Sequence, residues 1–240
     1  MIILAVDSSA GPASAALWDS SAGRLLAESF VHVKLTHSQT LTPMIRDMLS
    51  AAGALPADID GFAVSAGPGS FTGLRIGIAA VKGMAMALSR PCLAVSTLAV
   101  IAEPLVSFPG RSPGDMICAA MDARRGQVYN ALFTSTGSRI TPDRAVDLTT
   151  LGNELVQYAV PVIFAGDGAA LTAEFLQNWP IQGHLAPETL CFQRAASLAG
   201  LAAKADPFLW TSAAEVRPTY LRLPQAEREL RAKQENKEFV

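Results

Sequence analysis

The sequence predicts an α/β protein of two lobes, each built on a mixed sheet that is flanked by helices. Short apolar runs typical of buried strands alternate with longer segments of helical periodicity. Two prolines and two glycines within residues 108–114 predict a linker between the lobes. An apolar strand that ends in an aspartate and precedes a hairpin occurs on each side of this linker, at Asp7 and at Asp122. This weak internal repeat indicates two lobes of related topology.

The composition is typical of a globular protein with a substantial core. Half of the 240 residues are hydrophobic and 17% are charged, and the formal net charge is -2. That charge argues against an extended nucleic-acid-binding surface, although it leaves room for a local basic patch. The length suffices for two lobes of about 100 residues each. We expect a first lobe over 1–107, a second over 108–223 and a charged, solvated tail over 224–240.

The distribution of cysteines and of apolar runs predicts a cytoplasmic protein. Cys92, Cys118 and Cys191 are far apart, lie in apolar runs and form no CxxC motif, so we expect free thiols in a reducing compartment. The apolar start lacks a basic region and reaches Asp7, which predicts a strand rather than a signal peptide. We also expect no apolar run of the ~18 residues that a membrane span needs, and no membrane association.

In the first lobe, three strands precede the first helix. The apolar runs 2–6, 13–18 and 25–33 predict these strands, and a turn sequence over 19–23 joins the second and third as a hairpin. Apolar residues at i, i+3, i+4, i+7 and i+8 predict a helix over about 38–52. Its stripe comprises Leu41, Met44, Ile45, Met48 and Leu49. The remaining elements expected in this lobe are a strand over 62–66, a helix over about 71–89, a strand near 91–95 and a helix over 97–106.

The second lobe repeats the alternation with shorter signals. Strands are expected over 116–121 and 128–134, followed by a helix near 148–159 and a strand over 161–165. Gly166-Asp167-Gly168 follows that strand, and helices are expected near 169–178 and 188–204.

The segment from Gly67 to Gly77 is the most informative stretch, because a glycine-rich turn between a strand and a helix lets the backbone approach another group closely. A Walker A loop needs a lysine after its last glycine, where this chain has Leu74. The glycines at 67, 69 and 73 give GxGxxxG, one residue longer than the dinucleotide fingerprint. Neither nucleotide motif is therefore satisfied.

The helix that follows is unusually rich in small residues. Each glycine inside a helix costs ~1 kcal/mol relative to alanine, so close approach of another segment should offset Gly73, Gly77 and Gly83. Two interpretations remain open: the helix lies in the middle of its own lobe, or one face packs on the sheet and another on a partner chain.

No catalytic residue and no metal site is predicted. His32 and His37 share no face on a helix or a strand, His184 stands alone, and no GxSxG motif occurs. Asp7, with Ser8 and Ser9, is the candidate for a vestigial nucleotide or magnesium site, because actin-like ATPases place a magnesium-linked carboxylate at the end of a first buried strand. The preferred alternative is an aspartate that caps its own turn, and Asp122 has the same alternative.

The chain resembles the TsaB family of bacterial tRNA threonylcarbamoyladenosine biosynthesis proteins over nearly its whole length. The glycine loop 67–77 is the most specific motif. Supporting motifs occur in the expected order at 3–9, 37–43, 82–85, 95–98, 122–129, 166–168 and 218–222.

The resemblance implies an actin/hexokinase/Hsp70-like (ASKHA) fold and a non-catalytic scaffold role. TsaB-like subunits bind and activate the TsaD transferase, help recruit the TsaE ATPase and form homodimers when alone. The resemblance implies that tRNA is reached only through the complex. It implies no cofactor of its own, with ATP or ADP at the subunit boundary.

By position, the family's pairing helices correspond to 38–52 and 71–88. The partner interface that the resemblance implies then contains Leu41, Met44, Ile45, Met48, Phe71, Gly73, Ile76, Gly77, Ala79, Ala80 and Gly83.

Two other functions stay open on the sequence alone. One is an active ATP-dependent kinase or ATPase of the same fold, in which Asp7 organises magnesium and Gly166-Asp167-Gly168 lies near a nucleotide. The other is a generic dimerisation domain. Arg124 and Arg125 are candidates for a contact with tRNA, but the preferred interpretation is a solvated strand end.

Overall fold

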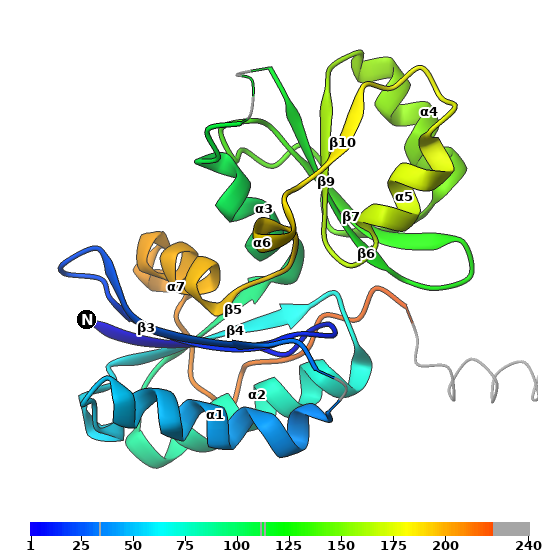
Figure 1. Ribbon diagram of the computed structural model, residues 1–240. Coiled ribbons are helices and arrows are strands. Elements are labelled where there is room, and N and C mark those ends of the chain that lie inside the picture. The colour runs from blue at the N-terminus through cyan, green and yellow to red at the C-terminus, as the bar shows by residue number, and fades with distance from the viewer. Residues whose placement is uncertain (34, 111, 113, 223–240) are drawn as a thin grey trace, which may run out of the picture.

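The structure is a computed structural model, and it describes residues 1–33, 35–110, 112 and 114–222. The described chain forms two lobes, one above the other in Figure 1, each with its own sheet. The predicted charged tail, 224–240, lies outside the described residues.

The first sheet has five strands in the order β3-β2-β1-β4-β5. The β1–β2 and β2–β3 pairs are antiparallel, and the β1–β4 and β4–β5 pairs are parallel. Burial on both faces explains the nearly continuous apolar sequence of β1 and β4. The strands are β1 (Ile2–Asp7), β2 (Ala13–Asp19), β3 (Arg24–Val31), β4 (Gly61–Gly67) and β5 (Cys92–Ser96).

The second sheet repeats this topology. Its order is β10-β9-β6-β7-β8, with β6–β7 and β7–β8 antiparallel and β6–β9 and β9–β10 parallel. The fourth and fifth strands of each sheet thus lie on the same side of the first. The predicted relation between the lobes is confirmed. The strands are β6 (Met116–Asp122), β7 (Gln127–Phe133), β8 (Arg144–Asp147), β9 (Val162–Ala165) and β10 (Gly183–Leu185).

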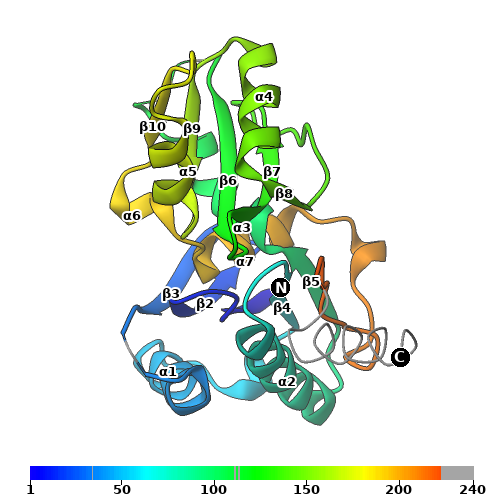
Figure 2. The ribbon, with the colours of Figure 1, turned by 90° about the vertical axis from the view of Figure 1, so that its right-hand side faces the viewer.

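Helices cover both sheets. Helices α1 and α2 lie side by side under the first sheet, and α4 and α5 cover the outer face of the second (Figures 1 and 2). The helices are α1 (His37–Ala51), α2 (Phe71–Leu88), α3 (Thr97–Val106), α4 (Leu148–Tyr158), α5 (Ala169–Leu176), α6 (Glu188–Cys191) and α7 (Ala195–Lys204). The 3-10 turns η1 (Pro56–Asp58) and η2 (Pro207–Leu209) join other elements.

Helix α3 lies between the lobes and contributes to both cores. Val100 packs in the cluster between the first sheet and α7, whereas Leu98, Ile101 and Leu105 pack against the second sheet. All four side chains are fully buried. The apolar contacts of α3 therefore join the lobes in this conformation.

The predicted second lobe, 108–223, needs a correction, because the chain returns to the first lobe at α7. Leu198 of α7 packs with Ile3 in one buried cluster. The Arg194 guanidinium lies 2.7 Å from the Glu28 carboxylate on β3. Further on, Thr211 exchanges two backbone hydrogen bonds of 2.8 Å with Cys92. The apolar pattern of α7 predicted a helix but carried no information on which sheet it covers.

Candidate functional site

The turn after β1 is organised by Asp7. The Asp7 carboxylate is buried, and its Oδ1 accepts hydrogen bonds from the Ser9 backbone N–H (2.9 Å) and the Ser9 hydroxyl (2.8 Å). The Ser65 hydroxyl on β4 donates to the other carboxylate oxygen. Both oxygens are thus used within the chain, in agreement with the capping role that the sequence analysis preferred.

The glycine loop packs against this same turn. Ser9 O accepts a 2.7 Å hydrogen bond from the Ser70 backbone, and the Ser8 hydroxyl donates to Gly73 O at 2.9 Å. A Cβ atom on Gly73 would overlap the Ser8 carbonyl oxygen, and one on Gly77 would overlap the Ser8 hydroxyl. The close approach that requires these two glycines is therefore to the chain's own turn. Their expected place at a partner interface is corrected.

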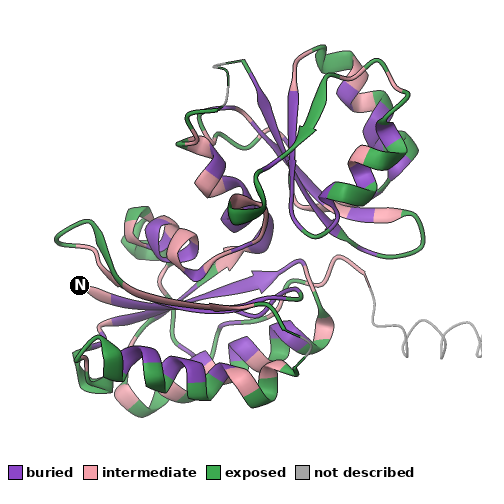
Figure 3. Cartoon of the chain, viewed as in Figure 1, coloured by how far each residue is buried: buried purple, intermediate pink, exposed green. Residues whose placement is uncertain are grey.

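The apolar stripe of α1 also faces inward. Leu41, Met44, Ile45 and Met48 are all buried against the first sheet, so these four predicted interface residues form part of the core. Periodicity had located the apolar face of α1 but could not show that the sheet covers it. Its outer face is polar and exposed, as the green side of α1 in Figure 3 shows.

Helix α2 has an exposed face of small and apolar residues. Its 18 residues have a mean hydropathy of 1.4, yet only 33% of them are buried. By length and composition alone α2 could cross a membrane, which corrects the expectation that no apolar run is long enough. Ala79 and Gly83 are exposed, and Ile76 and Ala80 are partly buried. These four predicted interface residues remain accessible.

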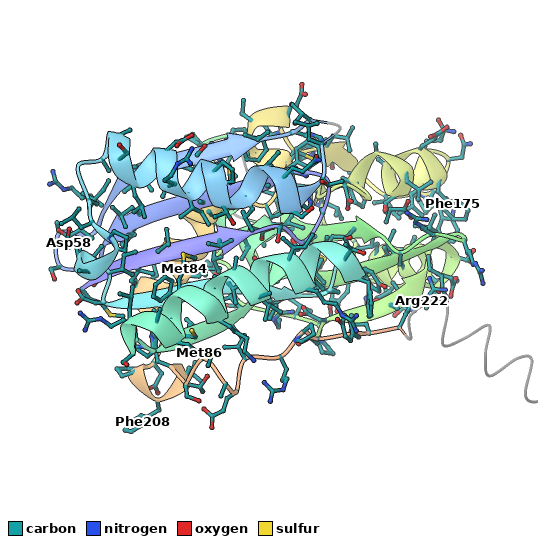
Figure 4. All side chains as sticks on the ribbon, turned by 90° about the horizontal axis from the view of Figure 1, so that it is seen from below. Asp58, Met84, Met86, Phe175, Phe208 and Arg222 are labelled. Atoms are coloured by element: carbon teal, nitrogen blue, oxygen red, sulfur yellow. The ribbon has the colours of Figure 1, made fainter. Side chains whose placement is uncertain are left out.

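Two further residues extend this face, and neither was predicted from the sequence. Met86 is 65% exposed and Ala87 is exposed, near the end of α2 (Figure 4). A periodicity of 3.6 residues counted onward from Ala79 and Gly83 would have found them. We call Ile76, Ala79, Ala80, Gly83, Met86 and Ala87 the α2 face.

The segment that follows η2, residues 210–222, runs alongside α2 as a strap, between the labels of Phe208 and Arg222 in Figure 4. The Lys82 ammonium holds two strap carbonyls, Ala214 O and Val216 O, each at 3.3 Å. Thr219 N donates to Ala66 O at 2.7 Å. Because the sequence of this segment has no apolar periodicity, its path could not be predicted.

An aromatic and cationic cluster fixes the strap to the start of α2. The Phe71 and Tyr220 rings stack at 4.8 Å between centroids, and the Arg75 guanidinium lies 3.8 Å from the Phe71 centroid. Arg75 Nε also donates to the Tyr220 hydroxyl at 3.0 Å. Phe71, predicted at the partner interface, is partly buried by these neighbours.

A cavity of about 730 Å³ opens between the lobes. Ser9 and the start of α2 line its first-lobe side, while Asp122 and Asp167 line the second-lobe side. The side chain of Asp167 reaches solvent there, yet the surrounding lobes displace enough water to raise its pKa above the ordinary value, and the Asp122 carboxylate acts in the same direction. Ser9 lines the cavity, whereas the Asp7 carboxylate is bonded within its own turn and is not among the lining residues.

The described residues 1–33, 35–110, 112 and 114–222 contain no group of three or more His, Cys, Asp or Glu side chains placed to hold a metal. His37 Nε2 lies 2.7 Å from Ala10 O, and the His32 ring packs on Phe192. The thiols of Cys92 and Cys118 are free and buried, which raises their pKa values to about 11 and about 12.

Comparison with known proteins connects this geometry to a family. A family model described as "TsaD: tRNA N6-adenosine threonylcarbamoyltransferase" matches residues 31–235. The tRNA threonylcarbamoyladenosine biosynthesis protein TsaB of Bacillus subtilis is 31% identical over 234 residues, which cover 95% of this chain and 96% of that protein. The chain belongs to the TsaB family. The TsaB of Escherichia coli is 38% identical over 133 residues, 55% of each chain.

Solved structures agree with membership of the TsaB family. YeaZ from Pseudomonas aeruginosa superposes with a TM-score of 0.73 at 30% identity, over 92% of this chain and 99% of that one. The ethanolamine utilization protein EutJ from Carboxydothermus hydrogenoformans shares the fold alone, with a TM-score of 0.52 at 12% identity. The duplicated strand order and these likenesses confirm the predicted α/β fold of two lobes, each built on a mixed sheet flanked by helices.

The buried Asp7 of this TsaB-family chain predicts a pH-dependent stability. Burial raises the folded-state pKa of Asp7 above its unfolded value of 3.8. Its stabilising contribution is therefore complete below pH ~3.8 and is lost as the pH rises through the folded pKa. Asp7→Asn keeps an acceptor for Ser9 without a buried charge. We expect its melting temperature, relative to wild type, to increase from about pH 4 to about pH 8.

Asp147 is a control of opposite sign. It caps α4 with two hydrogen bonds to Thr150, which lower the pKa of Asp147. Its contribution is present above pH ~3.8 and is lost as the pH falls, so Asp147→Asn should lose stability relative to wild type as the pH rises. Parallel slopes for the two variants in thermal melts would contradict the role assigned to Asp7.

Proposed function

We propose that this chain is a non-catalytic scaffold subunit in the synthesis of threonylcarbamoyladenosine in tRNA. In this proposal it pairs through α2 with a TsaD-like transferase, activates that transferase and helps to recruit a TsaE-like ATPase in the cytoplasm. The observation that carries the proposal is the α2 face, which is apolar, rich in small residues and exposed or only partly buried in the described chain.

Gly83 supports this use of α2. No atom lies within 4 Å of where its Cβ would be, so nothing in the described chain needs a glycine there. A glycine in that position nevertheless costs ~1 kcal/mol of helix stability relative to alanine. Close packing of a helix from another chain is the physical reason that would offset this cost. Ala79, one turn earlier on the same face, is also small and exposed.

The proposed partner interface contains fewer of the predicted residues than the interface expected from the sequence. In this proposal α1 contributes its polar outer face, which includes Thr42 and Arg46, to the partner interface. Its apolar stripe is buried in the chain's own core and does not take part. A flat α2 face bordered by polar groups also suits an isologous two-fold contact, because the same patch then faces itself. We therefore include a homodimer in the absence of the transferase.

The inter-lobe cavity is the observation that favours a second candidate, an ATP-dependent enzyme. Its volume of about 730 Å³ is in the range of small-molecule sites. The bonding of Asp7 to Ser9 and Ser65 speaks against magnesium chemistry there, so the scaffold proposal assigns the chain no cofactor of its own and places ATP or ADP at the boundary with its partner. Calorimetry with ATP on the isolated chain separates the candidates: micromolar binding with turnover would reject the scaffold role.

Nucleoside mass spectrometry on a strain depleted of this chain tests the function itself. Threonylcarbamoyladenosine should fall on depletion and return when the wild-type chain is restored. An unchanged level would reject the proposal and leave a generic dimerisation domain.

A further inference from the structure

Five of the eleven arginines of the described chain form ion pairs, whereas those along one edge do not. Carboxylates pair with Arg46, Arg90, Arg139, Arg144, Arg194 and Lys204. Within residues 1–33, 35–110, 112 and 114–222, the cationic side chains without such a partner are Arg24 and a set that we call the cationic strip. The strip consists of Lys82, Arg217, Arg75, Arg222, Arg124 and Arg125.

Hydrogen bonds show that the strip is continuous. Lys82 and Arg217 both bind Val216 O, at 3.3 and 3.0 Å, and the strap then leads to Arg75 at Tyr220. At the far end of the strap, Arg222 Nη1 donates to Ala123 O at 2.5 Å and to Arg124 O at 3.4 Å. The strip thus runs along α2 and crosses from the first lobe to the β6–β7 turn of the second, ending near the label of Arg222 in Figure 4.

The β6–β7 turn presents two adjacent arginines to solvent. Arg124 and Arg125 have φ angles of 63° and 59°, and Gly126 continues the left-handed run at 71°. A left-handed conformation costs about 1–2 kcal/mol for each non-glycine residue. Both arginine side chains are exposed. Positive φ angles of this kind close the tight hairpin between β6 and β7, and the turn leaves both guanidinium groups in solvent.

The carboxylates near the strip are engaged by backbone groups. Asp122 Oδ1 accepts from Arg124 N at 2.6 Å, and Asp167 Oδ1 accepts from Asp122 N at 3.2 Å. Glu215, beside the strap, accepts from Ser212 N at 3.0 Å. These acids shape the local backbone, while the guanidinium groups of the strip keep donors free for an external anion.

We propose that the cationic strip contacts the phosphate backbone of an RNA. The inference rests on the proposed function, which makes tRNA the substrate of the assembly, and it changes one expectation, because this subunit then touches the tRNA itself. Charge complementarity carries the argument: the strip is a line of unpaired cations on a chain whose net charge is -2. Arg75, stacked on Phe71, has the pre-organised guanidinium that suits a phosphate. Such contacts position the RNA without reading its sequence.

The test measures the binding of a fluorescent tRNA transcript to the full-length chain, and to its complex with the transferase, across a salt series. Arg124→Gln combined with Arg125→Gln should weaken binding roughly tenfold and lower the slope of log K against log salt by about 2. Arg124→Lys combined with Arg125→Lys keeps both charges and should restore most of the affinity. Equal melting temperatures for the two double variants show that a loss is not caused by misfolding.

Arg24→Gln is the matched control, since Arg24 is exposed and equally unpaired but lies at the start of β3, outside the strip. It should leave the affinity and the slope unchanged. An equal loss for Arg24→Gln, or no loss for the Gln double variant, would overturn the proposal. Competition experiments compare ATP and polyglutamate with tRNA at equal concentrations of negative charge. If ATP or polyglutamate displaces the bound tRNA, the strip binds a nucleotide or an acidic protein instead, and the proposal is overturned.

The two proposals can fail separately. If depletion of the chain leaves threonylcarbamoyladenosine unchanged while the Gln double variant still loses tRNA binding, the proposed function fails and the RNA contact stands. If the Gln double variant binds transferase and tRNA as wild type does, the RNA contact fails and the scaffold function stands.

Discussion

Replacing Gly83 by leucine is expected to abolish pairing with the transferase while the chain itself becomes slightly more stable. A Cβ atom added at Gly83 would meet nothing within 4 Å outside the backbone of its own helix, and leucine is favoured over glycine in a helix by up to ~1 kcal/mol. In a close-packed interface the same side chain has no space, and overpacking together with separation of the helices should weaken binding by at least about 100-fold. Size-exclusion chromatography and calorimetry with the transferase measure the loss.

Ala170→Leu is the control for Gly83→Leu. Ala170 is also exposed on a helix, but it lies on α5 in the second lobe. This variant adds apolar bulk at a distance from the α2 face and should bind the transferase as wild type does. Wild-type affinity for Gly83→Leu would show that the α2 face is not the interface, whatever its effect on stability.

Replacing Gly73 by alanine, a change of a single methyl group, is expected to destabilise the chain by about 2–4 kcal/mol. The added Cβ would overlap the backbone carbonyl oxygen of Ser8, and that backbone is held on both sides by the bonds of Asp7 and Ser9. A rigid neighbour cannot move aside as a flexible side chain would, so the turn or the helix must shift. For a chain of this size, the melting temperature should fall by roughly 5–15 °C.

Gly83→Ala is the matched partner of Gly73→Ala. It is the same chemical change in the same helix at a position with open space, and it should stabilise the chain by up to ~1 kcal/mol. Urea denaturation of both variants measures the difference. If the two variants shift stability by equal amounts, the contact between Gly73 and Ser8 does not explain why the loop is rich in glycine.

Local patterns in the sequence predicted the elements and the repetition of lobes, because those depend on periodicity and on turn chemistry. The strands that end at Asp7 and Asp122 occupy equivalent places in the two sheets, as the repeat indicated. Periodicity also located the apolar face of α1. Periodicity could not distinguish a helix face covered by the chain's own sheet from one that binds a partner. Met44 and Ile45 were therefore expected at the partner interface, whereas both are buried in the core.

The candidate site was harder to predict, because its parts meet across long distances in sequence. Gly73 and Gly83 look equivalent in an isolated helix, and only the position of Ser8, which is far away in the sequence, separates a core glycine from a surface one. Tyr220 and Arg222 lie in a strap without periodicity, so no local signal indicated that they reach Phe71 and the β6–β7 turn.

The return of the chain to its first lobe also orders events during synthesis. The second sheet is continuous, from Met116 to Leu185, and every one of its strands leaves the ribosome before α7 does. The first sheet has one face without its α7 cover until residues 195–204 are made, and Thr211 pairs with β5 later still. The lobe that begins the chain is thus the last to be completed, and the part of its inner face that α7 covers stays without that cover while the other lobe is translated.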